Sequence, residues 1–316
     1  MAYKQVDLQK VKTISIKNRK SKVRTQQFAR VFDPERQSFG EFAESLPQIL
    51  VAQDLKLFVK DVITSIKRKK PVIAMMGAHV IKVGLSPLIV DLLERKIITA
   101  VAMNSAASIH DVETAMWGTT SEDVQDNLED GTFGMSRETG EFINGVLNST
   151  WESEEYGYGE ALGKALQKAP NKKLSVLATC VRLNVPVTVH AAIGTDIIHQ
   201  QPTMDGGATG EMSFRDFKVL CNVVGQLRGG GVVMNIGSAV ILPEVFLKAL
   251  TVARNLGSKA QGFTSANFDM LQHYRSRMNV VSRPTRGTGK GYYFTGHHEI
   301  MIPLLCAMIK NEIVTR

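Results

Sequence analysis

Residues 71–110, with the sequence PVIAMMGAHVIKVGLSPLIVDLLERKIITAVAMNSAASIH, decide the fold of this chain. The apolar run over 72–76 is typical of a buried strand, and it meets a small-residue turn that begins at Gly77. Residues 86–87, Ser then Pro, indicate a helix start, because Ser is favoured at the N-cap and Pro at the first helical position. A second apolar run over 97–103 follows. The stretch therefore predicts strand, helix and strand.

The same alternation of strand and helix returns later in the chain. Four more strands are predicted over 185–189, 232–235, 259–264 and 291–294, each followed by small or polar residues. Strands that are joined by helical crossovers form parallel sheets with helices on both faces. We therefore predict an α/β fold, with a doubly wound, mostly parallel Rossmann-like sheet of about six strands.

Charge divides the chain into a basic N-terminal arm, residues 1–41, and a single α/β domain, residues 42–316. The net charge is +8, and residues 1–25 contain eight Lys or Arg and one Asp, so this short segment contributes +7. Because no stacking aromatic side chains alternate with these basic residues, we do not expect nucleic acid as a partner. We expect the arm to pack on a neighbouring subunit or to close over a cleft. A polar helical insert is predicted at about 119–173.

Composition favours a cytoplasmic protein. No window approaches the roughly 20 uninterrupted apolar residues of a membrane span, and the N-terminus lacks the charged-then-apolar order of a secretory signal. The cysteines, Cys180, Cys221 and Cys306, are widely spaced and odd in number, which suits buried reduced thiols. We expect a small-molecule ligand and no membrane partner.

Small residues follow several of the predicted strands, at the edge of the sheet where open α/β folds bind ligands. A glycine lets the backbone approach a phosphate closely, and the following helix N-terminus offers free N–H donors. No G-x-G-x-x-G motif is present. We predict that the following residues contact a dinucleotide cofactor: Gly77, Ala78, Asn104, Ser105, Gly237, Ser238, Ala266 and Gly296.

Histidines and acids gather at the same predicted edge. Six of the seven histidines fall at or just past predicted strand ends. Imidazoles move protons near neutral pH, and carboxylates orient imidazoles or bind an ammonium group. The catalytic candidates are His110, Asp111, Asp196 and His297. An alternative is a metal site built from members of the set His79, His110, His190, Asp196 and His199.

These motifs, in this order, resemble the deoxyhypusine synthase family. The resemblance runs from about Ser45 to Ile313. The segments that carry it are Gly77 to Arg95, Ala102 to Glu113, Val185 to Asp196, Asn235 to Val240, Ala266 to Asp269 and Gly296 to Leu305. It implies a Rossmann-like NAD-binding fold, a polyamine contact at Asp196, and assembly as a dimer or tetramer with sites at dimer interfaces.

The departures from the family fall on its chemistry. In the family a Lys in a Trp-Gly-Lys motif forms a covalent imine, and here the corresponding stretch is 281–284, Val-Ser-Arg-Pro. The family's His after a triple glycine corresponds to 242–244, Leu-Pro-Glu. Lys290 could substitute for the missing lysine only in a rebuilt loop. The resemblance therefore implies the fold and an NAD pocket, and it argues against hypusine formation.

We accordingly expect a divergent enzyme of this type, an NAD-dependent transferase or oxidoreductase that acts on a small amine or an amino-acid-like substrate. Two other functions stay open at this point. One is a metal-dependent enzyme that uses the strand-end His and Asp residues. The other is a non-catalytic scaffold that has kept the fold and lost the lysine.

Overall fold

The computed structural model describes residues 2–314, and the chain divides into two compact units, Met1–Gln53 and Asp54–Arg316. The first unit has mostly exposed side chains. Its helix α1 begins with a capping box, in which the side chains of Ser38 and Glu41 each accept a hydrogen bond from the other residue's backbone N–H. The helical elements that begin in this unit are η1 (Leu8–Lys10), η2 (Thr25–Gln27), α1 (Phe39–Ser45) and α2 (Leu50–Lys67).

The second unit contains a six-stranded sheet with the strand order β3-β2-β1-β4-β5-β6. Every neighbouring pair is parallel. The predicted doubly wound Rossmann-like α/β fold is therefore confirmed. The strands are β1 (Val72–Met76), β2 (Ala100–Asn104), β3 (Val187–His190), β4 (Val232–Ile236), β5 (Thr264–Asp269) and β6 (Lys290–Thr295).

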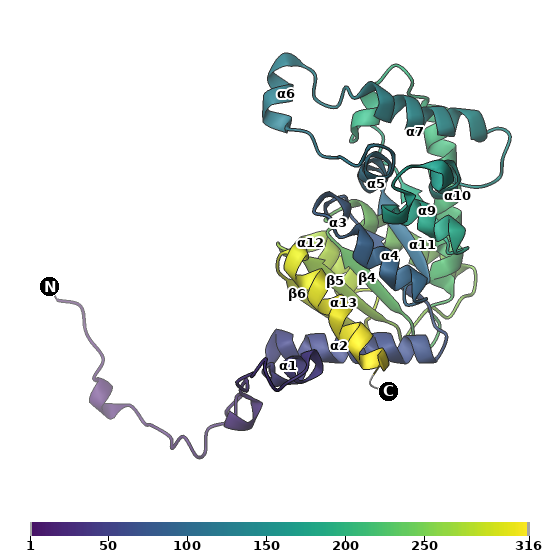
Figure 1. The fold of residues 1–316 in the computed structure, drawn as a ribbon. Coiled ribbons are helices and arrows are strands. Elements are labelled where there is room, and N and C mark those ends of the chain that lie inside the picture. The colour runs from purple at the N-terminus through teal and green to yellow at the C-terminus, as the bar shows by residue number, and fades with distance from the viewer. Residues whose placement is uncertain (1, 315–316) are drawn as a thin grey trace. The chain divides into compact units, whose positions relative to one another are not determined.

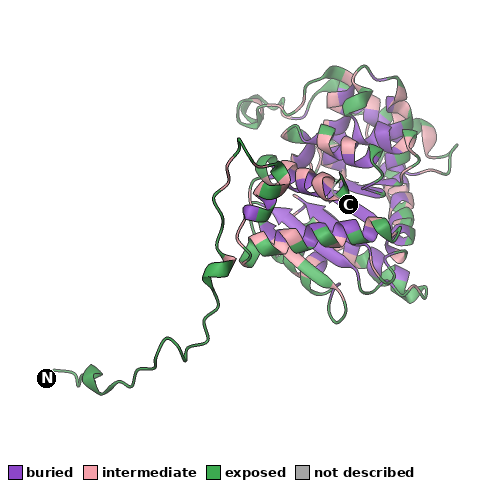
Figure 2. Ribbon diagram, turned by 60° about the horizontal axis from the view of Figure 1, so that its bottom comes forward, coloured by how far each residue is buried: buried purple, intermediate pink, exposed green. Residues whose placement is uncertain are grey.

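Helices cover both faces of this sheet, as Figure 1 shows. On one face, apolar residues of α10, α11 and η6 form a core with the odd-numbered positions of β1 and β4. On the other face lie α2, α4 and α13, and Phe58 of α2 packs on Phe268 and Phe294. The strands from β1 to β5 are consequently almost entirely buried in Figure 2, which explains the uninterrupted apolar sequences of β1 and β2, whereas the edge strand β6 has exposed residues.

The remaining helices alternate with the strands. Between β2 and β3 the chain forms several helices rather than one, and the predicted polar insert falls within this long crossover. The helices of the second unit, in chain order, are α3 (His79–Lys82), α4 (Ser86–Glu94), α5 (Ser105–Trp117), α6 (Val124–Asp130), α7 (Arg137–Thr150), α8 (Tyr158–Ala165), η3 (Leu166–Lys168), η4 (Lys172–Leu174), α9 (Val176–Arg182), η5 (Ile197–Gln200), α10 (Gly206–Gly225), α11 (Ile241–Asn255), α12 (Tyr274–Ser276), the π-helical η6 (Arg277–Ser282) and α13 (His298–Val314).

The position of the fifth strand differs from the prediction. Residues 259–264 were expected to form it, whereas β5 begins at Thr264 and continues to Asp269. The polar residues that resemble a turn are buried strand residues with partners, since Ser265 donates to the Val280 carbonyl and Asn235 donates to Asn267. A polar residue is tolerated in a buried strand when its hydrogen bonds are made, and the sequence alone does not show them.

Residues 105–111, which follow the second predicted strand, are helical. Asn104 ends the strand and caps α5 directly, because its side-chain oxygen accepts the N–H of Ala107. His110 and Asp111 therefore lie on the second turn of a helix, where neighbouring positions point in different directions.

The cysteines agree with the sequence analysis, since all three are free and buried. Within residues 2–314, no helix combines the length and the apolar character that crossing a membrane requires.

Candidate functional site

A cavity of about 630 Å³ lies at the carboxyl ends of β1, β2 and β3. The helices that follow β1 and β2, the loop that follows β3, and the start of the insert all contribute to its wall. The lining residues are Lys82, Ala106, Ile109, His110, Glu113, Trp117, Thr119, Thr120, Ser121, Glu122, Val124, Phe133, Ser136, Glu138, Thr139, Thr195, Asp196 and Ile197.

Four residues of this wall form a connected set of hydrogen bonds. Nδ1 of His110 is 2.6 Å from Oγ1 of Thr120, which donates to Oε2 of Glu113 over 2.5 Å. His110 and Glu113 are one turn apart on α5, and their side chains are 19% and 13% exposed. Thr139 of α7 donates to the other oxygen of Glu113 over 3.0 Å. Glu113 thus ties the insert to α5.

This chain of bonds determines which nitrogen of His110 carries the proton. A threonine hydroxyl has a single hydrogen, and Thr120 gives it to Glu113. Thr120 must therefore accept from Nδ1 of His110, which leaves Nε2 with its lone pair. Burial lowers the pKa of His110 below its ordinary value, an effect that Glu113 opposes. The neutral imidazole is suited to accept a proton.

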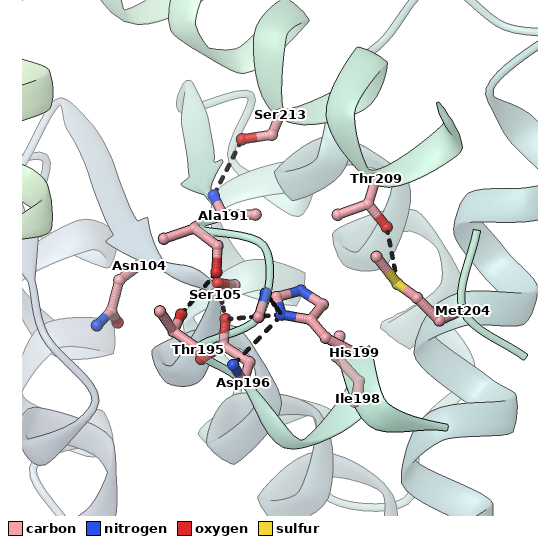
Figure 3. Close-up of polar contacts among 12 residues, drawn as sticks. Asn104, Ser105, Ala191, Thr195, Asp196, Ile198, His199, Met204, Thr209 and Ser213 are labelled. Atoms are coloured by element: carbon pink, nitrogen blue, oxygen red, sulfur yellow. Dashed lines mark hydrogen bonds and ion pairs between the residues drawn. The ribbon is translucent and has the colours of Figure 1, made fainter. Parts of the chain in front are cut away.

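Asp196 belongs to a second network of polar contacts, which Figure 3 shows. Ser105, at the start of α5, donates its hydroxyl to the carboxylate of Asp196. Nδ1 of His199 accepts the N–H groups of Gly194 and Asp196 over 3.2 and 3.3 Å. A ring nitrogen that accepts two donors carries no proton, so burial and these bonds keep His199 neutral, and burial lowers its pKa.

The cavity carries an excess of negative charge. Glu113, Glu122, Glu138 and Asp196 line it, and Lys82 is the single Lys or Arg among the described lining residues. Glu138 pairs with an exposed arginine outside the wall, and the other three carboxylates accept bonds from neutral hydroxyl, amide or backbone donors. A carboxylate that is bonded only to neutral donors keeps its full charge, which favours a cationic ligand.

The glycine turns at the switch point between β1 and β4 pack against each other. A Cβ atom on Gly77 would lie 2.2 Å from the carbonyl oxygen of Gly237, and one on Gly237 would lie 2.7 Å from Cε1 of His298. The interior of the turns is therefore filled by protein. Their close approach brings together the segments that lead from β1 to α3 and from β4 to α11, at the switch point where doubly wound sheets bind ligands.

The predicted site residues are distributed over several places. His110 and Asp196 both line the cavity, Ser105 supports Asp196, and Ala78 is half-buried at the start of α3. Ser238 is buried, and its Oγ accepts the N–H of Leu242 in α11. Asn104 is half-buried and caps α5.

Asp111 does not face the cavity, which corrects the prediction that it contacts substrate. It is fully buried and accepts the hydroxyl of Ser175 and the N–H groups of Val176 and Leu177 over 2.6, 2.8 and 3.1 Å. It therefore holds the start of α9. Burial raises its pKa to about 6, while these bonds act in the opposite direction.

Three other predicted residues lie away from the cavity. Ala266 is wholly buried within β5, so the expected cofactor contact at a turn is corrected. His297 is exposed beside α13, with Nδ1 3.7 Å from Glu299, and Gly296 precedes it. Both follow β6, which is separated from β2 by three strands in the sheet. His297 and His110 are therefore not brought together.

The histidines of the alternative metal site have separate environments. His79 lies against His298 with 5.5 Å between ring centres, and His190 contacts Thr188. Burial lowers the pKa of His190 to about 3. Within residues 2–314, no group of three or more His, Cys, Asp or Glu side chains is arranged to hold a metal ion.

Sequence reasoning missed several residues of the cavity wall. Glu113, Thr120, Thr139 and Lys82 were not predicted. The helical spacing of His110 and Glu113, three residues apart on one face, is the one pattern that could have revealed a pair. Lys290, considered as a replacement lysine, begins β6 and pairs with Asp61 over 2.6 Å at the opposite edge of the sheet.

Comparisons with known proteins support the fold. No protein-family model and no curated protein matches the sequence. Among solved structures, the complex of AgrE with ornithine and NAD+ has a TM-score of 0.54 at 11% identity and covers 84% of this chain and 34% of its own. A putative deoxyhypusine synthase from Entamoeba histolytica has a TM-score of 0.52 at 10% identity and covers 88% of this chain and 96% of its own.

A conserved putative LOR/SDH protein from Methanococcus maripaludis S2 has a TM-score of 0.52 at 15% identity and covers 83% of this chain and 70% of its own. The chain spans about a third of the length of AgrE and of ArgZ, an arginine dihydrolase with a similar fold. The chain therefore has the Rossmann-like fold that deoxyhypusine-synthase-like proteins share, in a divergent form.

Proposed function

We propose that this chain is a divergent enzyme of deoxyhypusine-synthase-like fold that binds a small amine or amino acid in the cavity and uses NAD at the neighbouring switch point. The observation that carries the proposal is the charge of the cavity, where four carboxylates and one ammonium group line a volume of about 630 Å³. This volume is in the range of small-molecule sites.

The chain's own residues supply binding and proton transfer. Asp196, Glu113 and Glu122 attract an ammonium group, and the Ser105 and Thr139 hydroxyls hold two of these carboxylates in place. His110, neutral and bonded through Nδ1, accepts at Nε2 a proton that the bound amine gives up. Apolar parts of Ile109 and the insert exclude water from one side.

We place the dinucleotide beside this cavity as part of the proposal. Its phosphates would lie at the N-termini of α3 and α11, next to Ala78 and Ser238. The chemistry that NAD supplies when bound is acceptance of a hydride. The short helix α3 connects the two places, because it begins at the switch point and ends at Lys82 in the cavity wall. AgrE, which has this fold, is known in complex with both ornithine and NAD+.

Calorimetric titration with 1,4-diaminobutane and with L-ornithine tests the cavity. Asp196→Asn keeps an oxygen that accepts the Ser105 hydroxyl and removes the charge. We expect it to weaken binding of the preferred ligand about tenfold, which corresponds to about 1.4 kcal/mol. Glu94→Gln, which changes an exposed carboxylate outside the cavity, is the matched control and should leave the affinity unchanged. Absence of binding by either ligand would favour the non-catalytic scaffold.

The cofactor is tested separately, with NAD as the titrant. Ala78→Glu introduces a carboxylate where the phosphates would lie, and Ala78→Gln has nearly the same volume without the charge. We expect the Glu variant to lose NAD binding and the Gln variant to retain most of it. Equal affinities of the two variants for NAD would contradict a phosphate site at α3.

A further inference from the structure

Lys82 is the one charged residue of the cavity wall that has no partner. It is the last residue of α3, its side chain is exposed, and within residues 2–314 it forms no ion pair or hydrogen bond through its ammonium group. It lies near enough to His110 to disfavour the charged form of that imidazole. An unpaired cation therefore faces the volume in which the ligand is proposed to bind.

The carboxylates of the wall come from other elements. Glu113 is on α5, Asp196 follows β3, and Glu122 and Glu138 come from the insert after α5. None of them forms an ion pair with Lys82. The wall consequently presents one ammonium group and several carboxylates, which come from separate parts of the chain. A ligand that carries both a negative and a positive group would complement this arrangement of charges.

A ligand whose only charged groups are ammonium groups forms no favourable interaction with Lys82. An additional cation beside Lys82 is repelled, and repulsion of this kind is a common basis of specificity against the wrong ligand. A carboxylate at the same place forms a charge-assisted hydrogen bond with the Lys82 ammonium group. Lys82 thus favours ligands that carry a carboxylate over ligands that carry only ammonium groups. The acidic residues alone would bind both classes equally well.

We infer that Lys82 binds the carboxylate of the ligand, so that the substrate is an α-amino acid with a second cationic group on its side chain and not a diamine or polyamine. This inference rests on the proposed function, and it names the substrate class of the same cavity. Lys82 holds the carboxylate end, and the acids of α5, of the loop after β3 and of the insert hold the cationic groups.

Matched ligand pairs test the inference on the full chain. L-ornithine and 1,4-diaminobutane differ only in the carboxylate, and L-lysine and 1,5-diaminopentane form a second such pair. In calorimetric titrations we expect the unmodified chain to bind the amino acid of each pair at least tenfold more tightly. Lys82→Met should abolish this preference while leaving diamine binding equal or stronger, and Lys82→Arg should retain it.

Lys168→Met is the matched control, because Lys168 is exposed and lies outside the cavity wall. It should leave both affinities unchanged. Equal binding of amino acid and diamine by the unmodified chain, or an equal loss of both in Lys82→Met, would overturn the role of Lys82 and leave the amine-binding function standing. If no ligand of either class binds, the proposed function itself fails, and with it the inference.

Discussion

Ser105 donates its hydroxyl hydrogen to the carboxylate of Asp196, although the two residues are 91 positions apart in the sequence. Ser105 begins α5 after β2, and Asp196 follows β3. The two strands are parallel neighbours, so the segments that leave their carboxyl ends meet at one edge of the sheet. This hydrogen bond fixes the position of a charged group in the cavity wall.

We expect Ser105→Ala to loosen the loop at 191–200. A hydrogen bond to a charged group contributes about 1.5–3 kcal/mol, and its loss should speed local opening of the loop. Hydrogen exchange of the backbone amides in this loop measures the effect. Ser149→Ala, on an exposed position of α7, is the control and should leave the loop unchanged. Unaltered exchange in the Ser105 variant would show that the bond does not hold the loop.

Thr120→Val should change the tautomer of His110 without unfolding the chain. The unmodified ring carries its proton on Nδ1 because the Thr120 hydroxyl oxygen accepts a hydrogen bond from Nδ1–H. A valine side chain has no atom that can accept this bond. Nitrogen chemical shifts of the labelled histidine distinguish the two tautomers. Thr120→Ser restores the hydroxyl and should restore the Nδ1–H form. If the proposed reaction depends on this base, its rate should fall about 100-fold in the valine variant.

The rate of the proposed reaction should also depend on pH in one direction. The pKa of His110 is below its ordinary value because of burial, so Nε2 stays available as a base down to a pH below about 6.5. The rate should fall only when the pH drops through this lowered pKa. A fall that begins well above pH 7 would exclude His110 as the proton acceptor.

Asp216 should lower the free energy of unfolding as the pH rises. It is fully buried between the N–H groups of Val189 and Gly159, and burial raises its pKa from 3.8 to about 8. The folded chain then binds a proton that the unfolded chain releases, so this contribution is complete below about pH 4 and is lost as the pH approaches about 8. Urea unfolding at pH 5 and pH 8 measures it, and Asp216→Asn should show a smaller difference between the two.

Gly77→Ala should destabilise the second unit. Its Cβ would lie 2.2 Å from a backbone carbonyl oxygen of Gly237, and backbone cannot move aside as a flexible side chain can. Overpacking of this kind costs about 1–3 kcal/mol. Gly210→Ala is the control, since nothing lies within 4 Å of the added methyl group and the position is helical. It should be neutral or stabilising, and a similar loss in both variants would contradict the close contact of the two turns.

The order of strands and helices, and with it the fold class, is predictable from the sequence by itself. A buried parallel strand must be apolar on both faces, so β1 and β2 appear as continuous apolar runs, and the residues after them mark the edge where ligands bind. The same reasoning failed at β5. The hydrogen bonds that the Ser265 hydroxyl donates and the Asn267 side-chain oxygen accepts involve distant residues, so the polar residues 265–267 were not predicted as strand.

Only the tertiary structure decided which polar side chains share a site. His110 and Asp111 are adjacent in the sequence, yet successive helical positions diverge by about 100°, so one faces the cavity and the other caps α9. Glu113, Thr120, Thr139 and Asp196 come together because the insert folds back over the carboxyl edge of the sheet. Such contacts depend on the directions of side chains from separate elements, and local sequence does not encode those directions.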